Sequence, residues 1–328
     1  MKMRVAMLLG GWCAVGVGVR AQVPAATSQS TSSQPPAPVV RHNPEIPTIT
    51  VESRLVNVAL NVVDETGAPV GGLTIDDFQL AEDSKPQKIA HFERESSTPL
   101  KIVLAIDASG SVLIDEKLEE MAAKSFIQSI LRQQDRMDLM SFSESVDEVV
   151  GFTNDQKRVE SGIGRIQLGS ATALYDAVYL AGQRLAEAPS AAGERRVIVL
   201  ITDGENTTRH GSYASAIEES ERAGAMVYAL IIVPIPADAG RNTGGEHALI
   251  QMSRDTGGKF YYVEDKRDLA PAFMHVSDDL RTQYTVEYYA PQKGGDVNGL
   301  RHIQLQLKDP TLRAKYKLRY RTAYYGDR

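Results

Sequence analysis

Residues 102–111 read Ile-Val-Leu-Ala-Ile-Asp-Ala-Ser-Gly-Ser, an unbroken apolar run that ends in a short polar loop. Five consecutive apolar residues followed by turn-forming residues are typical of a strand that is buried on both faces. Similar runs occur at Val197–Ile201 and Met226–Val233. Such strands occur mainly in parallel sheets whose two faces are covered by helices. The stretch therefore predicts an α/β fold with a mostly parallel central sheet.

Amphipathic segments separate the apolar runs, with apolar residues at intervals of three and four. The alternation of buried strands with helices predicts a doubly wound, Rossmann-like domain, which we place at residues 98–282. The predicted helices are Glu116–Leu131, Leu174–Ala188, Tyr213–Arg222, His247–Arg254 and Leu269–Arg281.

A different periodicity marks the segments on either side of this domain. Apolar residues alternate with more polar ones from Val56 to Val62, and alternation returns in three runs after Tyr284. Each segment has about 50 residues, which is too few to bury a stable core alone. We therefore expect residues 49–97 and 283–328 to form one β-sandwich, into which the α/β domain is inserted.

The N-terminus has the pattern of a secretory signal. Lys2 and Arg4 precede an apolar run, Val5–Val19, and Val19-Arg20-Ala21 offers small residues at the positions that a signal peptidase reads. We expect residues 1–21 to be a signal peptide and the protein to be exported to the periplasm, the cell surface or the medium. The run is shorter than the ~20 apolar residues that span a bilayer, so we expect no membrane span in the mature form. Residues 22–48 are rich in Ser, Thr and Pro and predict an unstructured linker.

Composition excludes several classes of protein. The formal net charge of −6 argues against a nucleic-acid-binding surface, which would be basic. The single cysteine, Cys13, excludes an intrachain disulfide and a cysteine-based zinc site. Lys2, Arg4 and Arg20 all lie within the predicted signal peptide, so cleavage would change the net charge to −9.

Oxygen-bearing side chains follow the ends of the predicted strands. Asp107, Ser109 and Ser111 are spaced by two, Thr172 precedes a predicted helix, and Asp203 follows an apolar run. Ligands of open α/β sheets bind at the carboxyl ends of the strands. Oxygen donors suit a hard divalent cation, Mg²⁺ first, with Mn²⁺ or Ca²⁺ as alternatives. If neutral hydroxyls supply most of the direct ligands, the ion keeps enough positive charge to attract an external carboxylate.

These residues resemble the metal-ion-dependent adhesion site of the von Willebrand factor type A domain family, written Asp-x-Ser-x-Ser, then a distant Thr and a distant Asp. The surrounding sequences, TALYDA at 172–177 and VLITDGE at 199–205, are similar as well. The resemblance covers about residues 100–281. It implies a non-catalytic module whose ion accepts a Glu or Asp carboxylate from a protein partner. It also implies that the last helix, Leu269–Arg281, moves on binding and pulls on the strand that begins at Tyr284.

The segments outside the domain extend the resemblance. Residues 73–86, LTIDDFQLAEDSKP, and the tyrosine pairs near the C-terminus look like those of exported family members that are common in acidobacteria. This wider resemblance implies the architecture and export, and it adds little about function.

Some of these residues also have simpler interpretations. Taken singly, Asp107 and Asp203 can act as helix N-caps, and the serines can form turns. We expect Asp176 to lie in the first turn of a helix, and we leave Glu205 out of the ligand set.

Other polar groups are not expected to bind ligands. Asp76, Asp77, Glu82 and Asp83 match no calcium loop and predict a solvated turn. Asn206 begins a glycosylation sequon that we interpret as coincidental.

Two alternatives to adhesion remain open. In a metal-assisted hydrolase the ion would activate a water, but no His or Lys accompanies the motif to act as a base, so we expect no enzymatic activity. In a structural role, the ion would only order the loops while the β-sandwich bound the partner.

Overall fold

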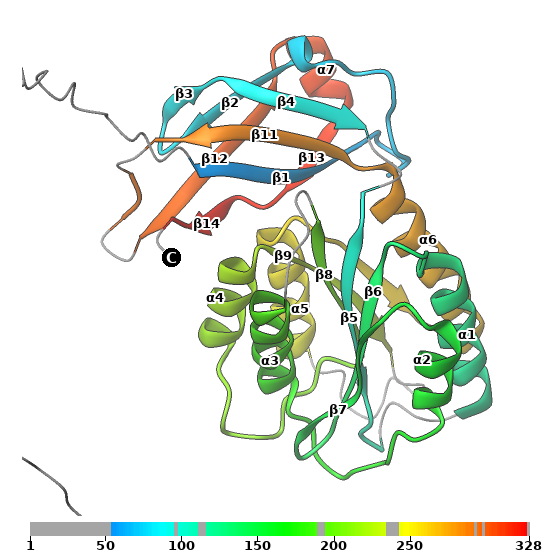
Figure 1. Cartoon of the computed structure of the whole chain (residues 1–328). Coiled ribbons are helices and arrows are strands. Elements are labelled where there is room, and N and C mark those ends of the chain that lie inside the picture. Colours follow the sequence, from blue (N-terminus) through cyan, green and yellow to red (C-terminus); the bar gives the residue numbers. More distant parts are fainter. Residues whose placement is uncertain are drawn as a thin grey trace, which may run out of the picture. The chain divides into compact units, whose positions relative to one another are not determined.

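The computed structural model of the chain describes residues 54–94, 98–110, 116–188, 194–233, 243–291, 294–296 and 299–326 (Figure 1). All of them belong to one compact unit, residues 51–328. The predictions for residues 1–48 and for Ser111 fall outside the described residues. Within the described ranges, no helix combines the length and the apolar character needed to cross a membrane.

Strand β5 (Leu100–Asp107) lies inside a six-stranded sheet, and all eight of its residues are buried. The strand order is β10-β9-β8-β5-β6-β7, and only β7 runs antiparallel to its neighbour. The other five strands are β6 (Arg136–Phe142), β7 (Val146–Thr153), β8 (Arg195–Thr202), β9 (Ala225–Ile232) and β10 (Phe260–Val263).

Helices cover both faces of this sheet (Figure 1). Apolar residues of α1 (Glu116–Ile130), α2 (Gln156–Ile163) and α6 (Leu269–Thr282) pack in one core cluster. Those of α3 (Leu174–Glu187), α4 (Tyr213–Ala223) and α5 (Thr243–Asp255) pack in a second cluster on the other face. A short helix η3 (Lys266–Asp268) precedes α6. The predicted α/β fold with a mostly parallel sheet is therefore confirmed.

The predicted helices end within one residue of the observed ends, and the larger differences concern α5 and α2. Helix α5 begins at Thr243, four residues before the predicted start. Helix α2 was not predicted, because only Val159 and Gly162 among its residues are buried. Its start is fixed by Asp155, whose side chain accepts a hydrogen bond from the backbone N–H of Arg158.

The flanking segments form two four-stranded sheets, ordered β13-β1-β11-β4 and β14-β12-β2-β3. Strand β1 (Arg54–Val63) pairs antiparallel with β11 (Tyr284–Ala290), with Val58 opposite Val286. Side chains of both sheets meet in a third core cluster. The other elements are η1 (Ile75–Asp77), β2 (Phe78–Glu82), β3 (Lys85–Gln87), β4 (Ile89–Arg94), β12 (Leu300–Leu307), α7 (Pro310–Lys315), β13 (Lys317–Tyr320) and β14 (Ala323–Tyr325). Segments from both ends of the sequence therefore share both sheets and their core.

Glu82 corrects the prediction of a solvated acidic turn. Its side chain is 1% exposed, and one carboxylate oxygen accepts hydrogen bonds from the hydroxyls of Tyr288 and Tyr324, at 2.6 and 2.7 Å. The other oxygen accepts a hydrogen bond from Arg301 at 2.8 Å. Asp83 accepts hydrogen bonds from the backbone N–H groups of Gly295 and His302. Asp76 is exposed, whereas Glu82 and Asp83 join strands of the C-terminal segment to β2.

A single residue, Gln283, separates α6 from β11. Gln283 is fully buried and donates a hydrogen bond to the hydroxyl of Tyr228 in β9. Arg195, the first residue of β8, donates to the backbone carbonyl of Leu280 and to the hydroxyl of Thr285. Hydrogen bonds to β8 and β9 therefore hold both the end of α6 and the start of β11 in place.

Candidate metal centre

Asp107 is the last residue of β5 and is completely buried. One carboxylate oxygen accepts a 2.9 Å hydrogen bond from the backbone N–H of Ser109. The other accepts a 2.6 Å hydrogen bond from the hydroxyl of Thr202 at the end of β8. This second contact follows from strand register, since Ile106 of β5 lies opposite Ile201 of β8. Neighbouring parallel strands therefore end at the same edge of the sheet with their polar groups in contact.

The pKa of Asp107 is raised to about 6, first because burial disfavours the charged carboxylate. Hydrogen bonds from Thr202 and Ser109 act in the opposite direction, and the negative charge of Asp203 raises the pKa further. The site therefore brings two carboxylates close enough to repel one another in a poorly solvated position.

Ser109 and the loop before Thr172 are connected through the backbone. Ser109 forms an isolated parallel bridge with Gly169, and the N–H of Gly169 donates to the carbonyl of Ala108 at 2.9 Å. Thr172 is 2% exposed, so its short side chain lies within the protein rather than in solvent.

The loop that carries Thr172 is held from both sides. On one side, Glu144 accepts hydrogen bonds from the backbone N–H and the hydroxyl of Ser170. These hydrogen bonds lower the pKa of Glu144 to about 2. On the other side, the hydroxyl of Thr207 accepts a 2.8 Å hydrogen bond from the N–H of Thr172, whose carbonyl accepts from the N–H of Thr207 at 3.0 Å. Thr207 thus joins the loop after β8 to the loop of Thr172.

Asp203 follows β8 directly and is 8% exposed. Its carboxylate accepts a 3.0 Å hydrogen bond from the N–H of Glu205. Gly204 between them has φ of +84°, and a Cβ atom there would lie 3.0 Å from the backbone of Gly245 at the start of α5. A side chain is therefore disfavoured at this position both by backbone conformation and by space.

Hydrogen bonds connect Asp107 to Ser109 and to Thr202, which directly precedes Asp203, and they connect Thr172 to Thr207 in the loop that follows Asp203. Ser111 lies outside the described residues. Among the described residues, no Lys, Arg or His forms an ion pair with Asp107 or Asp203. No described group of three His, Cys, Asp or Glu side chains could hold a metal ion either. An ion bound here would therefore depend on hydroxyl ligands in addition to the two carboxylates.

This donor set fits a hard divalent cation. Two buried carboxylates without a nearby cation need positive charge, and the hydroxyl oxygens offer further ligands of the type that Mg²⁺ accepts. Asp107, Ser109, Ser111, Thr172 and Asp203 would hold the ion.

Two supporting residues were missed from the sequence. Thr202 and Thr207 hold the ligands in place, and only their positions beside Asp203 and in the sequon could have drawn attention to them. Asp176 lies in the first turn of α3, as predicted, and accepts a weak 3.4 Å hydrogen bond from Thr208. Asn206 uses both polar atoms of its side chain inside the protein, since it accepts from the N–H of Tyr175 and donates to the carbonyl of Thr208.

Comparison with solved structures finds similar α/β domains at low sequence identity. The protein BatB from Bacteroides thetaiotaomicron is 19% identical, with a TM-score of 0.44, covering 55% of this chain and 97% of that one. A von Willebrand factor type A protein from Catenulispora acidiphila is 13% identical, with a TM-score of 0.48, covering 82% and 72%. The vWF domain of the type V pili tip protein Mfa5 from Porphyromonas gingivalis is 12% identical, with a TM-score of 0.46, covering 56% and 95%.

No functionally curated protein matches the sequence. The family model of the von Willebrand factor type A domain matches residues 101–275, which is more than half of the chain and contains all five predicted ligands. The chain therefore belongs to the von Willebrand factor type A domain family.

Proposed function

We propose that this chain is an exported, non-catalytic protein-binding module that holds Mg²⁺ at the edge formed by β5 and β8. The family commonly mediates protein–protein interaction. The observation that carries the proposal is the burial of Asp107 beside the negative charge of Asp203 without a cationic side chain. Burying two like charges is costly, and a divalent cation would remove that cost.

The partner is proposed to be a protein that presents a Glu or Asp side chain. A bound Mg²⁺ would supply one coordination position that protein ligands leave open and that an external carboxylate can fill. The chain's own residues fix the ligand positions: Thr202 orients Asp107, Thr207 orders the loop of Thr172, and Glu144 holds the preceding turn. Because the mature chain is expected to carry a net charge of −9, attraction of an acidic partner has to be local to this edge.

Binding is favoured over hydrolysis by the surroundings of the ligands. None of the described contacts of Asp107, Thr172 or Asp203 involves a histidine or a lysine. Each of these contacts instead restrains a proposed ligand, as expected for a site that must keep a fixed geometry.

Metal binding is tested by titrating Mg²⁺ and Mn²⁺ into the purified chain in a calorimeter. Asp107→Asn and Asp203→Asn are expected to weaken binding about tenfold or more, which corresponds to ~1.4 kcal/mol. Asp147→Asn is the matched control, because Asp147 is exposed on β7. Equal affinities in all four proteins would reject the metal site.

The adhesion mechanism is tested by capturing partners from the native envelope with the full mature chain, in Mg²⁺ and in EDTA. Partners captured in Mg²⁺ are expected to be lost in EDTA and with Asp107→Asn. If that variant lost the metal but kept the same partners, the ion would be structural and the sandwich would be the binding surface. N-terminal sequencing of the mature protein tests export, and we expect it to begin at Gln22.

A further inference from the structure

A second concave site lies where β8 begins, at the other end of the strand that leads to Asp203. A pocket of about 310 Å³ is lined by β1, the start of β8, the end of α4, Thr256 and Arg321. An adjoining pocket of about 170 Å³ shares Arg196 and Arg321 with it and adds Arg54 and Arg222. An eight-residue strand is roughly 25 Å long, so these pockets are remote from the candidate metal centre.

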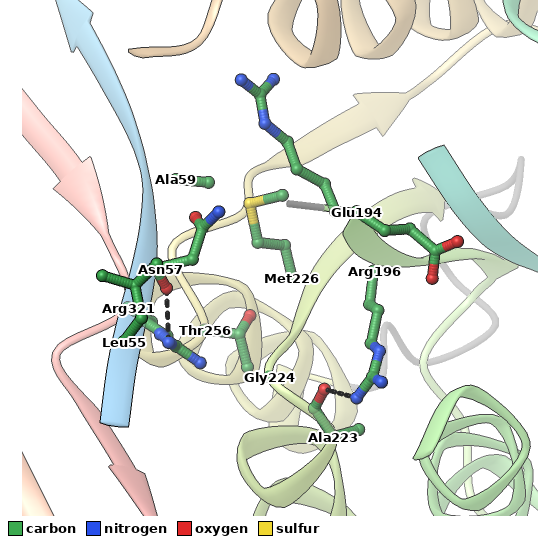
Figure 2. Close-up of a pocket in the computed structure, with 11 residues that line it drawn as sticks. Leu55, Asn57, Ala59, Glu194, Arg196, Ala223, Gly224, Met226, Thr256 and Arg321 are labelled. Atoms are coloured by element: carbon green, nitrogen blue, oxygen red, sulfur yellow. Dashed lines mark hydrogen bonds between the residues drawn. The ribbon is translucent and has the colours of Figure 1, made fainter. Parts of the chain in front are cut away.

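Arginine side chains enter the larger pocket from different elements (Figure 2). Arg321 donates to the backbone carbonyl of Asn57 in β1, and Arg196 donates to that of Ala223 at the end of α4, at 2.7 Å. Figure 2 shows these two contacts on different sides of the pocket. Both guanidinium groups are thus held in place by hydrogen bonds to backbone carbonyls.

Arg321 lines both pockets. It forms no ion pair with any described residue, and its Nε is buried without a hydrogen-bond partner. Burial lowers its pKa, and the positive charges of Arg54 and Arg196 act in the same direction. Its guanidinium also lies 5.4 Å from the centre of the Tyr324 ring. An oxygen ligand bound in the pocket would give this N–H group an acceptor.

Two of the glutamates near the pockets are paired with other cations. Glu194 is paired with Lys101 at 2.7 Å, and Glu218 is paired with Arg222 at 2.6 Å. Glu221 lines the smaller pocket but makes no ion pair with a described residue. Burial and the charges of Asp255 and Glu218 raise the pKa of Glu221 to about 7, whereas the charge of Arg321 acts in the opposite direction. Arginines outnumber glutamates among the residues that line each pocket, so the lining carries an excess of positive charge.

We propose that this pocket binds a small multivalent oxyanion of the phosphate class, held by Arg321 and Arg196. A phosphate group presents oxygens in several directions, whereas a carboxylate presents one edge. It therefore suits guanidinium groups that approach from different elements. The volume is in the range of small-ligand sites. Because β1, β8 and Arg321 come from different segments of the chain, a bound anion would connect the sandwich to the α/β domain.

The proposal is tested by phosphate titrations followed by thermal unfolding and calorimetry. They use the mature chain in EDTA at constant ionic strength, with chloride as the reference anion. EDTA keeps phosphate from binding through a metal ion, so the result is independent of the candidate metal centre. Phosphate is expected to raise Tm saturably, and Arg321→Gln is expected to weaken its affinity about tenfold or more. Arg158→Gln is the matched control, because Arg158 is exposed on α2.

A second pair of variants, at Leu55, tests the proposal even if Arg321→Gln fails to fold. Leu55 lines both pockets, and its side chain is 47% exposed. Leu55→Glu would place a carboxylate beside the arginines and compete with phosphate, whereas Leu55→Gln would add a neutral side chain of the same size. We expect Leu55→Glu to lose phosphate affinity and Leu55→Gln to keep it.

Three results would overturn the proposal. The first is a phosphate effect no larger than that of chloride at equal ionic strength. The second is equal affinity in the Leu55→Glu and Leu55→Gln variants. The third is binding to phosphatidic acid vesicles without binding to inorganic phosphate, which would assign the arginines to a lipid surface instead. Binding to inorganic phosphate that Leu55→Glu abolishes would support the small-anion site.

Discussion

The hydroxyl of Thr202 lies 2.6 Å from Oδ2 of Asp107 and joins the ends of two neighbouring parallel strands. The same hydroxyl oxygen accepts a 3.1 Å hydrogen bond from the N–H of Gly204. One threonine side chain therefore sets the position of a predicted ligand and the start of the loop that carries Asp203.

Thr202→Val keeps the shape of this side chain and removes its hydroxyl. Leaving a buried carboxylate oxygen without its donor costs about 1–3 kcal/mol. We expect a lower free energy of unfolding in EDTA and weaker Mg²⁺ binding, measured by urea unfolding and calorimetry. Thr311→Val on exposed α7 is the control. Unchanged Mg²⁺ affinity in Thr202→Val would show that Asp107 is not held by this hydroxyl.

Glu144→Gln tests the support of the Thr172 loop. The variant loses the charged acceptor for Ser170, so we expect Mg²⁺ affinity to fall several-fold while the fold is kept. Since the pKa of Glu144 is lowered to about 2, its contribution is present above about pH 4.5 and is lost as the pH falls toward 2. Calorimetry at pH 7 measures the affinity, with exposed Glu65→Gln as the control. A Glu144→Gln protein with wild-type affinity would contradict this role.

Asp138 on β6 predicts a pH dependence of stability. Its side chain is completely buried, and Arg184 approaches one carboxylate oxygen only to 3.6 Å. Burial, followed by the charge of Glu148, raises its pKa to about 7. The folded protein therefore binds an extra proton between about pH 4 and 7, and its stability falls as the pH rises through that window.

The Asp138→Asn variant isolates this effect, because other raised carboxyl groups such as Asp107 and Glu221 remain in both proteins. The difference in free energy of unfolding between wild type and variant is expected to change by up to about 1.4 kcal/mol per pH unit. Urea unfolding from pH 4.5 to 7.5 in EDTA measures it. Parallel pH profiles for the two proteins would show that Asp138 titrates normally.

Glu82→Gln tests whether the two flanking segments depend on one another. The variant removes the charge that pairs with Arg301 and weakens the bonds from the hydroxyls of Tyr288 and Tyr324. Breaking a buried pair costs about 3–5 kcal/mol. We expect a lower Tm and faster proteolysis of both β segments, with Glu65→Gln unchanged. Loss of the N-terminal β segment alone would contradict a shared core.

The local sequence pattern was enough to predict the α/β fold, because the buried parallel strands β5 and β8 each contain five consecutive apolar residues, 102–106 and 197–201. The same pattern placed Asp107 and Asp203 at strand ends, and parallel pairing then brought those ends together. Helix α2 was not predicted, because its two buried residues are too few to show the periodicity of an amphipathic helix.

The buried state of Glu82 could not be predicted locally, since its partners lie 206 to 242 residues away along the chain. Nothing in the sequence around an acidic residue shows that distant tyrosines and an arginine will satisfy it. Thr202 and Thr207 were missed for a related reason, because their hydroxyls act on residues 95 and 35 positions away.

The pairing of β1 with β11 also sets an order of events during folding. Asn57 and Glu287, which are in contact across these strands, are 230 residues apart in sequence. β1 is made first, yet its neighbours β11 and β13 leave the ribosome only after the whole parallel sheet. Contacts of such long range form slowly, and both edges of β1 stay unpaired at least until β11 has been synthesised. The sheet that contains β1 can therefore close only after synthesis has passed residue 320, and a chain truncated before β11 would be left with both edges of β1 exposed.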